Sequence, residues 1–259
     1  GNDTITQTDL IRRRWLNNDF YGFTYALNYN KDNLQMTLGG GYNTYKGKHF
    51  GEIIWSEFAS TSEIRDRYYE GNGRKKEFSL FAKSTYRLND ALTLFGDLQL
   101  RKVSYKTKGI TSDLVNMRID ENYNFFNPKA GISYQLNNNN NFYFSYACGN
   151  REPSRSDFEN NPNIKPEQLN DFELGWRLKK SGFGLSTNVY YMHYNEQLVM
   201  TGAIDDVGAP VRDNSGESYR LGLEVAADIT LLKDLLYFQP NFTLSSNKNK
   251  EVFYIYDGA

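Results

Sequence analysis

Residues 218–231 read SYRLGLEVAADITL, and this stretch decides the fold class of the chain. Its odd-numbered positions, from Tyr219 to Leu231, are apolar or aromatic, whereas the even-numbered positions include Arg220, Glu224 and Asp228. Because successive side chains of a β-strand point to opposite faces, the stretch predicts a strand with one apolar and one charged face. A strand of roughly ten residues or more can cross a bilayer at a tilt. We therefore expect a sheet that faces lipid on one side.

The same alternation recurs along the chain, with a rhythm of short turns and long connections. Turns rich in Asn, Asp and Gly close one end of the predicted sheet, because these residues tolerate the left-handed backbone of a hairpin turn. A strand is also expected before Trp15, followed by a turn at Asn17–Asp19. The other strands are expected near residues 20–30, 34–46, 77–88, 91–106, 126–136, 141–150, 168–180, 183–195, 218–231 and 235–247. Long polar loops are expected at 47–76, 107–125, 151–167 and 196–217.

This order of strands predicts an all-β fold, an antiparallel up-and-down transmembrane β-barrel of the bacterial outer membrane. Aromatic residues make up 15% of the chain, as suits the aromatic girdles at the two membrane interfaces. No stretch approaches the roughly 18 consecutive apolar residues of a transmembrane helix. The net charge of −1 gives no bias toward nucleic acid, which we do not expect as a partner.

Residues that could carry catalysis are sparse. The chain has two histidines, His49 and His193, and one cysteine, Cys148. It contains no His-Glu-x-x-His, Cys-x-x-Cys or Gly-x-Ser-x-Gly motif. We therefore expect no enzyme, no catalytic residue, no resident metal and no cofactor.

Residues 145–198 are the most specific part of the sequence. They contain Arg-Glu-Pro-Ser at 151–154, Asn-Pro-Asn-Ile-Lys-Pro-Glu at 161–167 and Phe-Glu-Leu-Gly at 172–175. This arrangement resembles TonB-dependent outer-membrane receptors, in a style similar to those of the Bacteroides group. The residues that carry the resemblance are Arg151, Pro153, Ser154, Lys165, Pro166, Glu167, Glu173 and Gly175.

The resemblance implies a 22-stranded barrel, of which residues 1–259 would supply about ten to twelve strands. We expect the plug domain, the N-terminal region that contacts TonB and the terminal strand of the family to lie outside residues 1–259. We expect residues 1–259 to be one fragment of the barrel, in contact with membrane lipid outside and with the plug inside.

The long loops contain the side chains expected to bind a ligand. Aromatic rings pack against flat or apolar ligands, and arginines bind anions through two parallel hydrogen bonds. Long extracellular loops of such proteins are aromatic and charged in any case, so the alternative is a purely solvated role for each residue. The candidate ligand-binding residues are Trp55, Arg65, Arg67, Tyr68, Tyr69, Arg151, Arg155 and Arg212.

The sequence thus predicts an active-transport receptor that binds a scarce small-molecule nutrient and imports it with TonB-coupled energy. A ferric chelate, or siderophore, is the first expected substrate, because such ligands are bulky and often anionic. Receptors for haem, cobalamin or a glycan are alternatives within the same class. A passive porin, an outer-membrane enzyme and a soluble β-sandwich are alternatives from other classes.

Overall fold

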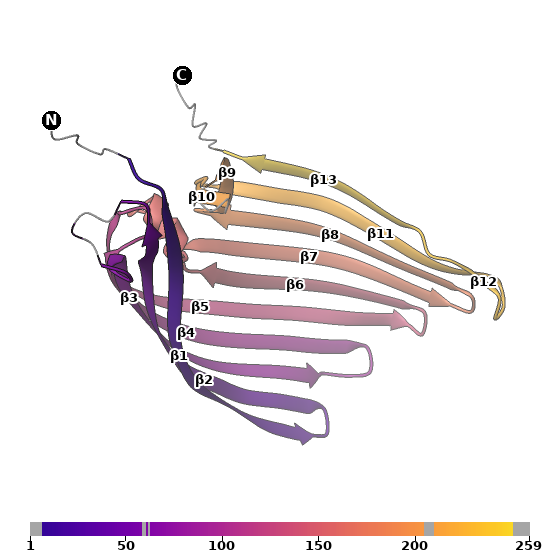
Figure 1. Ribbon diagram of the computed structural model, residues 1–259. Helices are drawn as coiled ribbons and strands as arrows, with labels where there is room; N and C mark the ends of the chain where they lie inside the picture. Colours follow the sequence, from indigo (N-terminus) through magenta and orange to yellow (C-terminus); the bar gives the residue numbers. More distant parts are fainter. Residues whose placement is uncertain (1–6, 59–60, 62, 205–209, 251–259) are drawn as a thin grey trace. The chain divides into compact units, whose positions relative to one another are not determined.

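The computed structural model describes residues 7–58, 61, 63–204 and 210–250. Within them the chain forms thirteen strands and one short helix, so the all-β prediction is confirmed (Figure 1). The elements are β1 (Leu10–Lys31), β2 (Leu34–Ser56), β3 (Arg67–Arg87), β4 (Leu92–Ile110), β5 (Asn116–Asn137), β6 (Asn140–Arg151), α1 (Arg155–Asn160), β7 (Glu167–Lys180), β8 (Phe183–Asn195), β9 (Leu198–Ile204), β10 (Pro210–Asn214), β11 (Ser218–Leu232), β12 (Leu236–Phe238) and β13 (Asn241–Asn249).

The strands follow one another in the up-and-down order that the sequence predicts. The main sheet runs β1-β2-β3-β4-β5-β6-β7-β8-β11-β12, and β13 also pairs with β11. This sheet has eleven strands, within the predicted range of ten to twelve, while β9 and β10 form a separate hairpin. In the short turns, Asp32 and Asp234 adopt the positive φ angles that their residue type tolerates.

Two compact units divide the chain, and each is described by itself. The first unit comprises residues 1–24, 41–78 and 102–123, and the second comprises residues 25–40, 79–101 and 124–259. The strands β1 to β5 contribute residues to both units.

The second unit shows how the predicted alternation builds a wall. Pairing between β5, β6, β7, β8, β11 and β13 places one apolar residue of each strand in a continuous row. The row consists of Ile132, Phe144, Leu174, Val189, Leu223 and Leu244. Its members are exposed, with Leu174 at 57% and Leu244 at 63%, so this face is apolar without being a protein core. The residues one position along lie on the opposite face, where Glu173 pairs with Tyr190.

Three predicted boundaries are wrong, and in each case strand pairing is the reason. β1 is continuous from Leu10 to Lys31, so no turn occurs at Asn17–Asp19, and the Tyr45 hydroxyl donates to Asn18 across the strands at 2.7 Å. The loops predicted at 47–76 and 107–125 shrink to 57–66 and 111–115. Backbone hydrogen bonds to a neighbouring strand outweigh the weak turn preference of polar residues.

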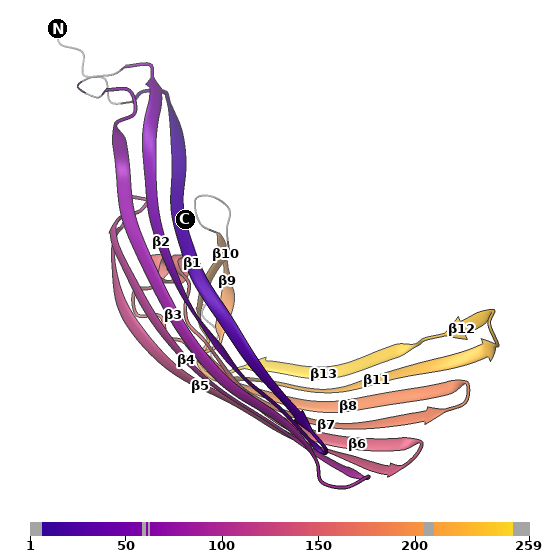
Figure 2. The same ribbon diagram turned by 90° about the horizontal axis from the view of Figure 1, so that it is seen from below.

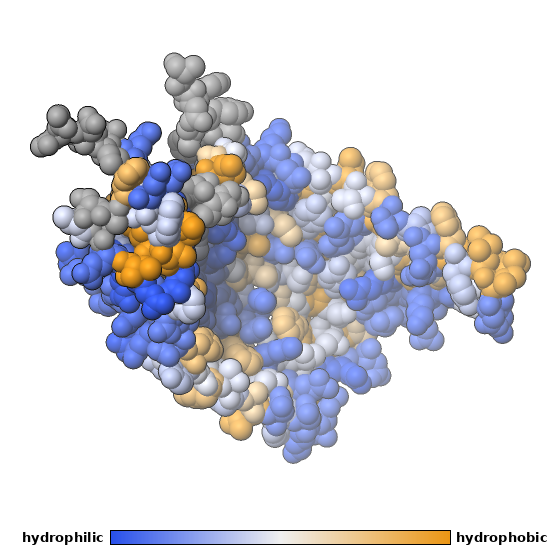
Figure 3. All heavy atoms as spheres, in the orientation of Figure 1, coloured by the Kyte–Doolittle hydropathy of each residue, from blue (hydrophilic) through white to orange (hydrophobic). Residues whose placement is uncertain are grey.

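The strand predicted at 235–247 is divided into β12 and β13 at Gln239-Pro240. Proline lacks an N–H group and therefore interrupts a ladder. Beside this break, apolar side chains of the β11–β12 turn are strongly exposed, including Leu232, Leu235 and Leu236 (orange at the right of Figure 3).

No helix among the described residues is long and apolar enough to cross a membrane, a finding that does not bear on crossing by strands.

Candidate ligand-binding loops

The connection between β6 and β7 is organised around the buried carboxylate of Asp157. Ser154 caps α1, and its backbone N–H and hydroxyl donate to Asp157 Oδ2 at 2.7 and 2.8 Å. The Arg212 guanidinium, from β10, donates to both oxygens of the same carboxylate at 3.0 and 3.1 Å. Only 2% of Asp157 is exposed, so four donors compensate the loss of its hydration.

Asparagines extend this junction along the two connections. The Asn161 amide donates to Asp213 at 2.9 Å, and the Lys165 backbone N–H donates to the Asn214 side chain at 2.8 Å. Asn214 in turn donates to the backbone carbonyls of Lys165 and Glu196. Figures 1 and 2 both draw α1 beside the β9–β10 hairpin. The connections 151–167 and 196–217 thus form one hydrogen-bonded platform, excluding residues 205–209, which lie outside the described part of the chain.

The predicted ligand residues of the second unit therefore differ in their surroundings. Arg212 is held by Asp157, and Arg151 pairs with Glu167 at 3.2 Å across β6 and β7. Arg155 is half-buried on α1, and its Nε is buried without a hydrogen-bond partner. Of these three, Arg155 is the one whose guanidinium is not held by a carboxylate in the ion pairs described above, although its Nε is buried.

In the first unit, the structure brings together three predicted residues of β3, Arg67, Tyr68 and Tyr69. The two tyrosine rings meet edge to face with centroids 5.0 Å apart, and the Arg67 guanidinium lies 4.1 Å from the Phe50 ring centroid. Gly51 permits this packing, because a Cβ atom at that position would lie 2.3 Å from the Tyr68 ring. We refer to Phe50, Gly51, Arg67, Tyr68 and Tyr69 as the aromatic cluster.

The remaining candidates of the first unit, Trp55 and Arg65, are not part of the aromatic cluster. Trp55 lies in β2, not in a loop, and half of its side chain is exposed. Arg65 lies in the β2–β3 connection with a φ of 73°, and its backbone N–H donates to the Ile53 carbonyl at 2.7 Å.

Glu173 and Gly175 of β7, two of the residues that carry the family resemblance, lie on the charged face of the second unit. Gly175 pairs directly with Tyr143, and a Cβ atom on Gly175 would lie 2.0 Å from the Tyr143 ring. The glycine therefore lets the ring lie across the strand, where Arg177 stacks over it at 4.8 Å. A shallow groove of about 370 Å³ on this face is lined by Tyr143, Arg177, Asn188 and Glu224, among others.

Sequence reasoning missed the residues that organise the platform. Asp157, Asn161, Asp213 and Asn214 were not among the candidate ligand-binding residues, although they hold the two connections together. The capping-box spacing of Ser154 and Asp157 was the signal that could have indicated α1.

An exposed ion pair ends the connection before β11. A hydrogen bond from the Lys250 ammonium group, together with the attraction between the two charges, lowers the pKa of the Glu217 carboxyl. The backbone N–H of Lys250 also donates to the Glu217 carbonyl at 2.9 Å. No group of three or more His, Cys, Asp or Glu side chains that could hold a metal ion occurs among the described residues.

A family model described as "TonB dependent receptor-like, beta-barrel" matches residues 1–258. The chain belongs to this family. TonB-dependent receptors are transport receptors of the outer membrane, and that location is therefore the location of this chain. The resemblance stated from residues 145–198 and the partial-barrel fold are both confirmed.

Solved structures share the fold at low sequence identity. The copper transporter OprC is 13% identical with a TM-score of 0.74, and the alignment covers 93% of this chain and 39% of that one. The siderophore receptor PiuA from Acinetobacter baumannii is 15% identical with a TM-score of 0.63, over 92% and 39% of the two chains. The ferric yersiniabactin uptake receptor FyuA from Yersinia pestis is 16% identical with a TM-score of 0.60, over 93% and 37%. No curated protein matches the sequence. The chain thus spans less than half the length of these structures, and the likeness shows the fold alone.

Proposed function

We propose that this chain forms part of the wall and extracellular loops of an active-transport receptor, which takes up a scarce nutrient with TonB-coupled energy. The observation that carries the proposal is the family match over residues 1–258. In this proposal residues 1–259 are one piece of a 22-stranded barrel, and the plug domain and the TonB-contacting region belong to the same receptor. The exposed apolar rows contact lipid, and the charged face that contains Glu173 and Gly175 contacts the plug or lumen water.

A ferric chelate is the nutrient that we propose first. Several proteins of similar fold are named for such ligands, among them receptors for ferric yersiniabactin and ferric citrate. A copper transporter has a similar fold, so the barrel fold does not set the substrate. In this proposal the loops select it. Here Arg155 on α1 and the aromatic cluster on β2 and β3 suit an anionic chelate with flat rings. Haem, cobalamin and glycan receptors, and a passive porin, are the alternatives that the experiment must separate.

Uptake by the full-length receptor in cells tests this function. Radiolabelled iron chelates, haem, cobalamin and an oligosaccharide are supplied to cells with and without TonB. We expect a single ligand class, a ferric chelate, to be taken up in a TonB-dependent manner. Uptake that persists equally without TonB would show a passive pore instead.

Matched variants then assign the binding residues. Arg155→Ala and Tyr68→Ala should each reduce uptake at low ligand concentration by about tenfold, with unchanged surface abundance. Arg87→Ala, an exposed arginine beside the short β3–β4 turn, is the control and should transport normally. Normal uptake by both loop variants would remove these residues from the binding site.

A further inference from the structure

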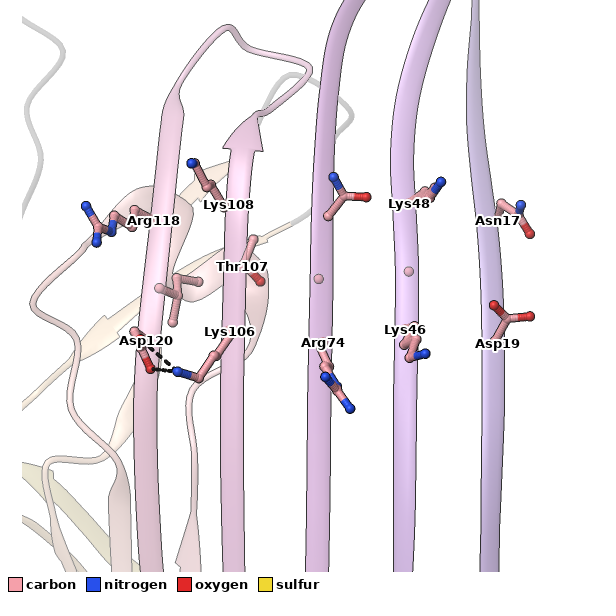
Figure 4. A pocket seen from close by; sticks show the side chains of 14 residues that line it. Asn17, Asp19, Lys46, Lys48, Arg74, Lys106, Thr107, Lys108, Arg118 and Asp120 are labelled. Atoms are coloured by element: carbon pink, nitrogen blue, oxygen red, sulfur yellow. Dashed lines mark hydrogen bonds and ion pairs between the residues drawn. The ribbon is translucent and has the colours of Figure 1, made fainter.

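A groove of about 640 Å³ in the first unit is strongly basic. It crosses β1 to β5 and is lined by six basic side chains and two acidic ones (Figure 4). Lys46 and Lys48 come from β2, Arg74 from β3, and Lys106 and Lys108 from β4. Arg118 of β5 completes the basic set. Asp120 pairs with Lys106 at 2.8 Å, and Figure 4 draws no other ion pair among these residues. The side chains that line the groove therefore carry a net positive charge.

The basic side chains share one face of the sheet. Along β4 the exposed Lys106 and Lys108 alternate with Thr107, which is 4% exposed. Along β2 the exposed Lys46 and Lys48 likewise flank the buried Gly47. Because side chains alternate between faces, the cations stand on the exposed face and do not point into the packed side of these strands.

Exposed aromatic residues continue the same face along the same strands. On β1, Asn17 and Asp19 line the groove, and the next residues of that parity are Tyr21 and Phe23, which are 67% and 63% exposed. On β3, Phe78 follows Arg74 at the same parity and is 46% exposed. Four residues of strand span roughly 13 Å, so the cations lie within about that distance of the aromatic rings, on the side of the long connections.

We propose that this groove binds the phosphate groups of an anionic glycolipid in the outer leaflet of the membrane. The inference goes beyond nutrient transport but rests on the lipid-facing orientation proposed above. Exposed aromatic rings mark the membrane interface, and long loops mark the outer side of such barrels. The glycolipids of that leaflet carry phosphates on their sugars, and several Lys and Arg side chains together provide the charge to hold them. A soluble nutrient drawn through the barrel interior would not meet this face.

Lipid binding to the purified full-length receptor tests the proposal. The probes are bisphosphorylated lipid A, the same lipid without its phosphates, and inorganic phosphate, each titrated in nonionic detergent and followed by native mass spectrometry. We expect lipid A to bind and its phosphate-free form to bind at least tenfold more weakly. Equal binding of the two lipids would overturn the proposal, and so would displacement of lipid A by an equal concentration of inorganic phosphate, since the groove would then be a free-anion site.

Charge-matched variants locate the binding. K46Q/R74Q/K108Q should bind lipid A roughly tenfold or more weakly. K31Q/R87Q/K233Q removes three basic residues near the short turns and should bind within twofold of the unmodified receptor. Equal weakening in both triple variants, or in neither, would overturn the assignment. If the groove variant does not fold, as judged by the loss of its heat-modifiable band on a gel, lipid A binding is compared instead between the single variants R74Q and R87Q. Only R74Q should then bind lipid A more weakly.

Nutrient uptake separates this proposal from the transport function. The groove variant should bind less lipid A while it still takes up nutrient at a given surface abundance. Loss of uptake with unchanged lipid binding would count against the groove as a lipid site and would place these cations in transport instead.

Discussion

The two regions that contain most of the predicted ligand residues are built on different physical principles. In the β6–β7 and β8–β11 connections, Arg212 is tied to a buried carboxylate with four donors, within a network of side-chain amides. In the aromatic cluster, Arg67 forms an exposed pair with Glu70 and stacks on Phe50, while the tyrosines pack on each other. The first arrangement fixes a backbone, whereas the second buries Tyr69, at 7% exposed, and leaves Arg67 exposed at the surface. An arginine in a long loop is therefore not by itself a sign of ligand binding.

The largest effect is expected when the buried carboxylate of the first region is removed. Asp157→Ala should destabilise the platform by about 2 to 4 kcal/mol, because it removes a buried carboxylate that four donors satisfy, although Arg212 can partly rehydrate. Hydrogen exchange of residues 151–167 and 210–217 in the full-length receptor measures the loss. Glu159→Ala on the same helix is the control and should change little. Equal exchange in the two variants would show that the platform does not depend on Asp157.

A double-mutant cycle sharpens the same point. Arg212→Ala alone should cost about as much as Asp157→Ala, and the two changes together should cost less than their sum by about 1.5 to 3 kcal/mol. The cycle is measured by hydrogen exchange of the same segments. Additive costs would mean that Arg212 is available for a ligand after all.

A larger side chain at Gly51 should destabilise the aromatic cluster. Gly51→Ala places a methyl group against the Tyr68 ring and should destabilise the β2–β3 hairpin by about 1 to 3 kcal/mol. Limited proteolysis of the β2–β3 connection measures this change. The double variant G51A/Y68A removes the clash with Tyr68 but keeps the contact with Tyr69, which would lie 2.4 Å from the new Cβ, and should therefore recover part of the loss. By contrast, Arg67→Ala should cost less than about 1 kcal/mol, because its ion pair with Glu70 is exposed.

The smallest expected effect concerns pH. The lowered pKa of Glu217 means that its pair with Lys250 contributes stability above the ordinary pKa of glutamate, and that this contribution disappears as the pH falls through the lowered pKa. Hydrogen exchange of residues 217–220 and 247–250 should therefore rise on acidification, and high salt should weaken the dependence. Glu217→Gln should remove it. A pH dependence that survives in Glu217→Gln would assign the effect to another group.

The strand wall could be predicted from the sequence because its signal is local. Residues 218–231 alternate between apolar and charged side chains, and β11 occupies Ser218–Leu232. The turn at Asn17–Asp19 was wrong because Asn and Asp favour turns only weakly, and pairing of β1 with β2 supplies partners for the backbone groups on that side of β1. Loops 47–76 and 107–125 were overestimated for the same reason. In the second of them, Met117, Ile119, Tyr123 and Phe125 alternate with polar residues, a signal that could have predicted the start of β5.

By itself the sequence determined the fold class, the order of the strands and the family, because a two-residue period and the motifs of residues 145–198 are local features of the chain. Only the tertiary structure decided which charged side chains pair with one another and which gather on one face. Arg212 and Asp157 are 55 residues apart, and their pairing depends on how two connections meet. The basic groove likewise needs five strands in register to bring six cations onto one face. Charges act through distance in space, and only the paired strands set those distances.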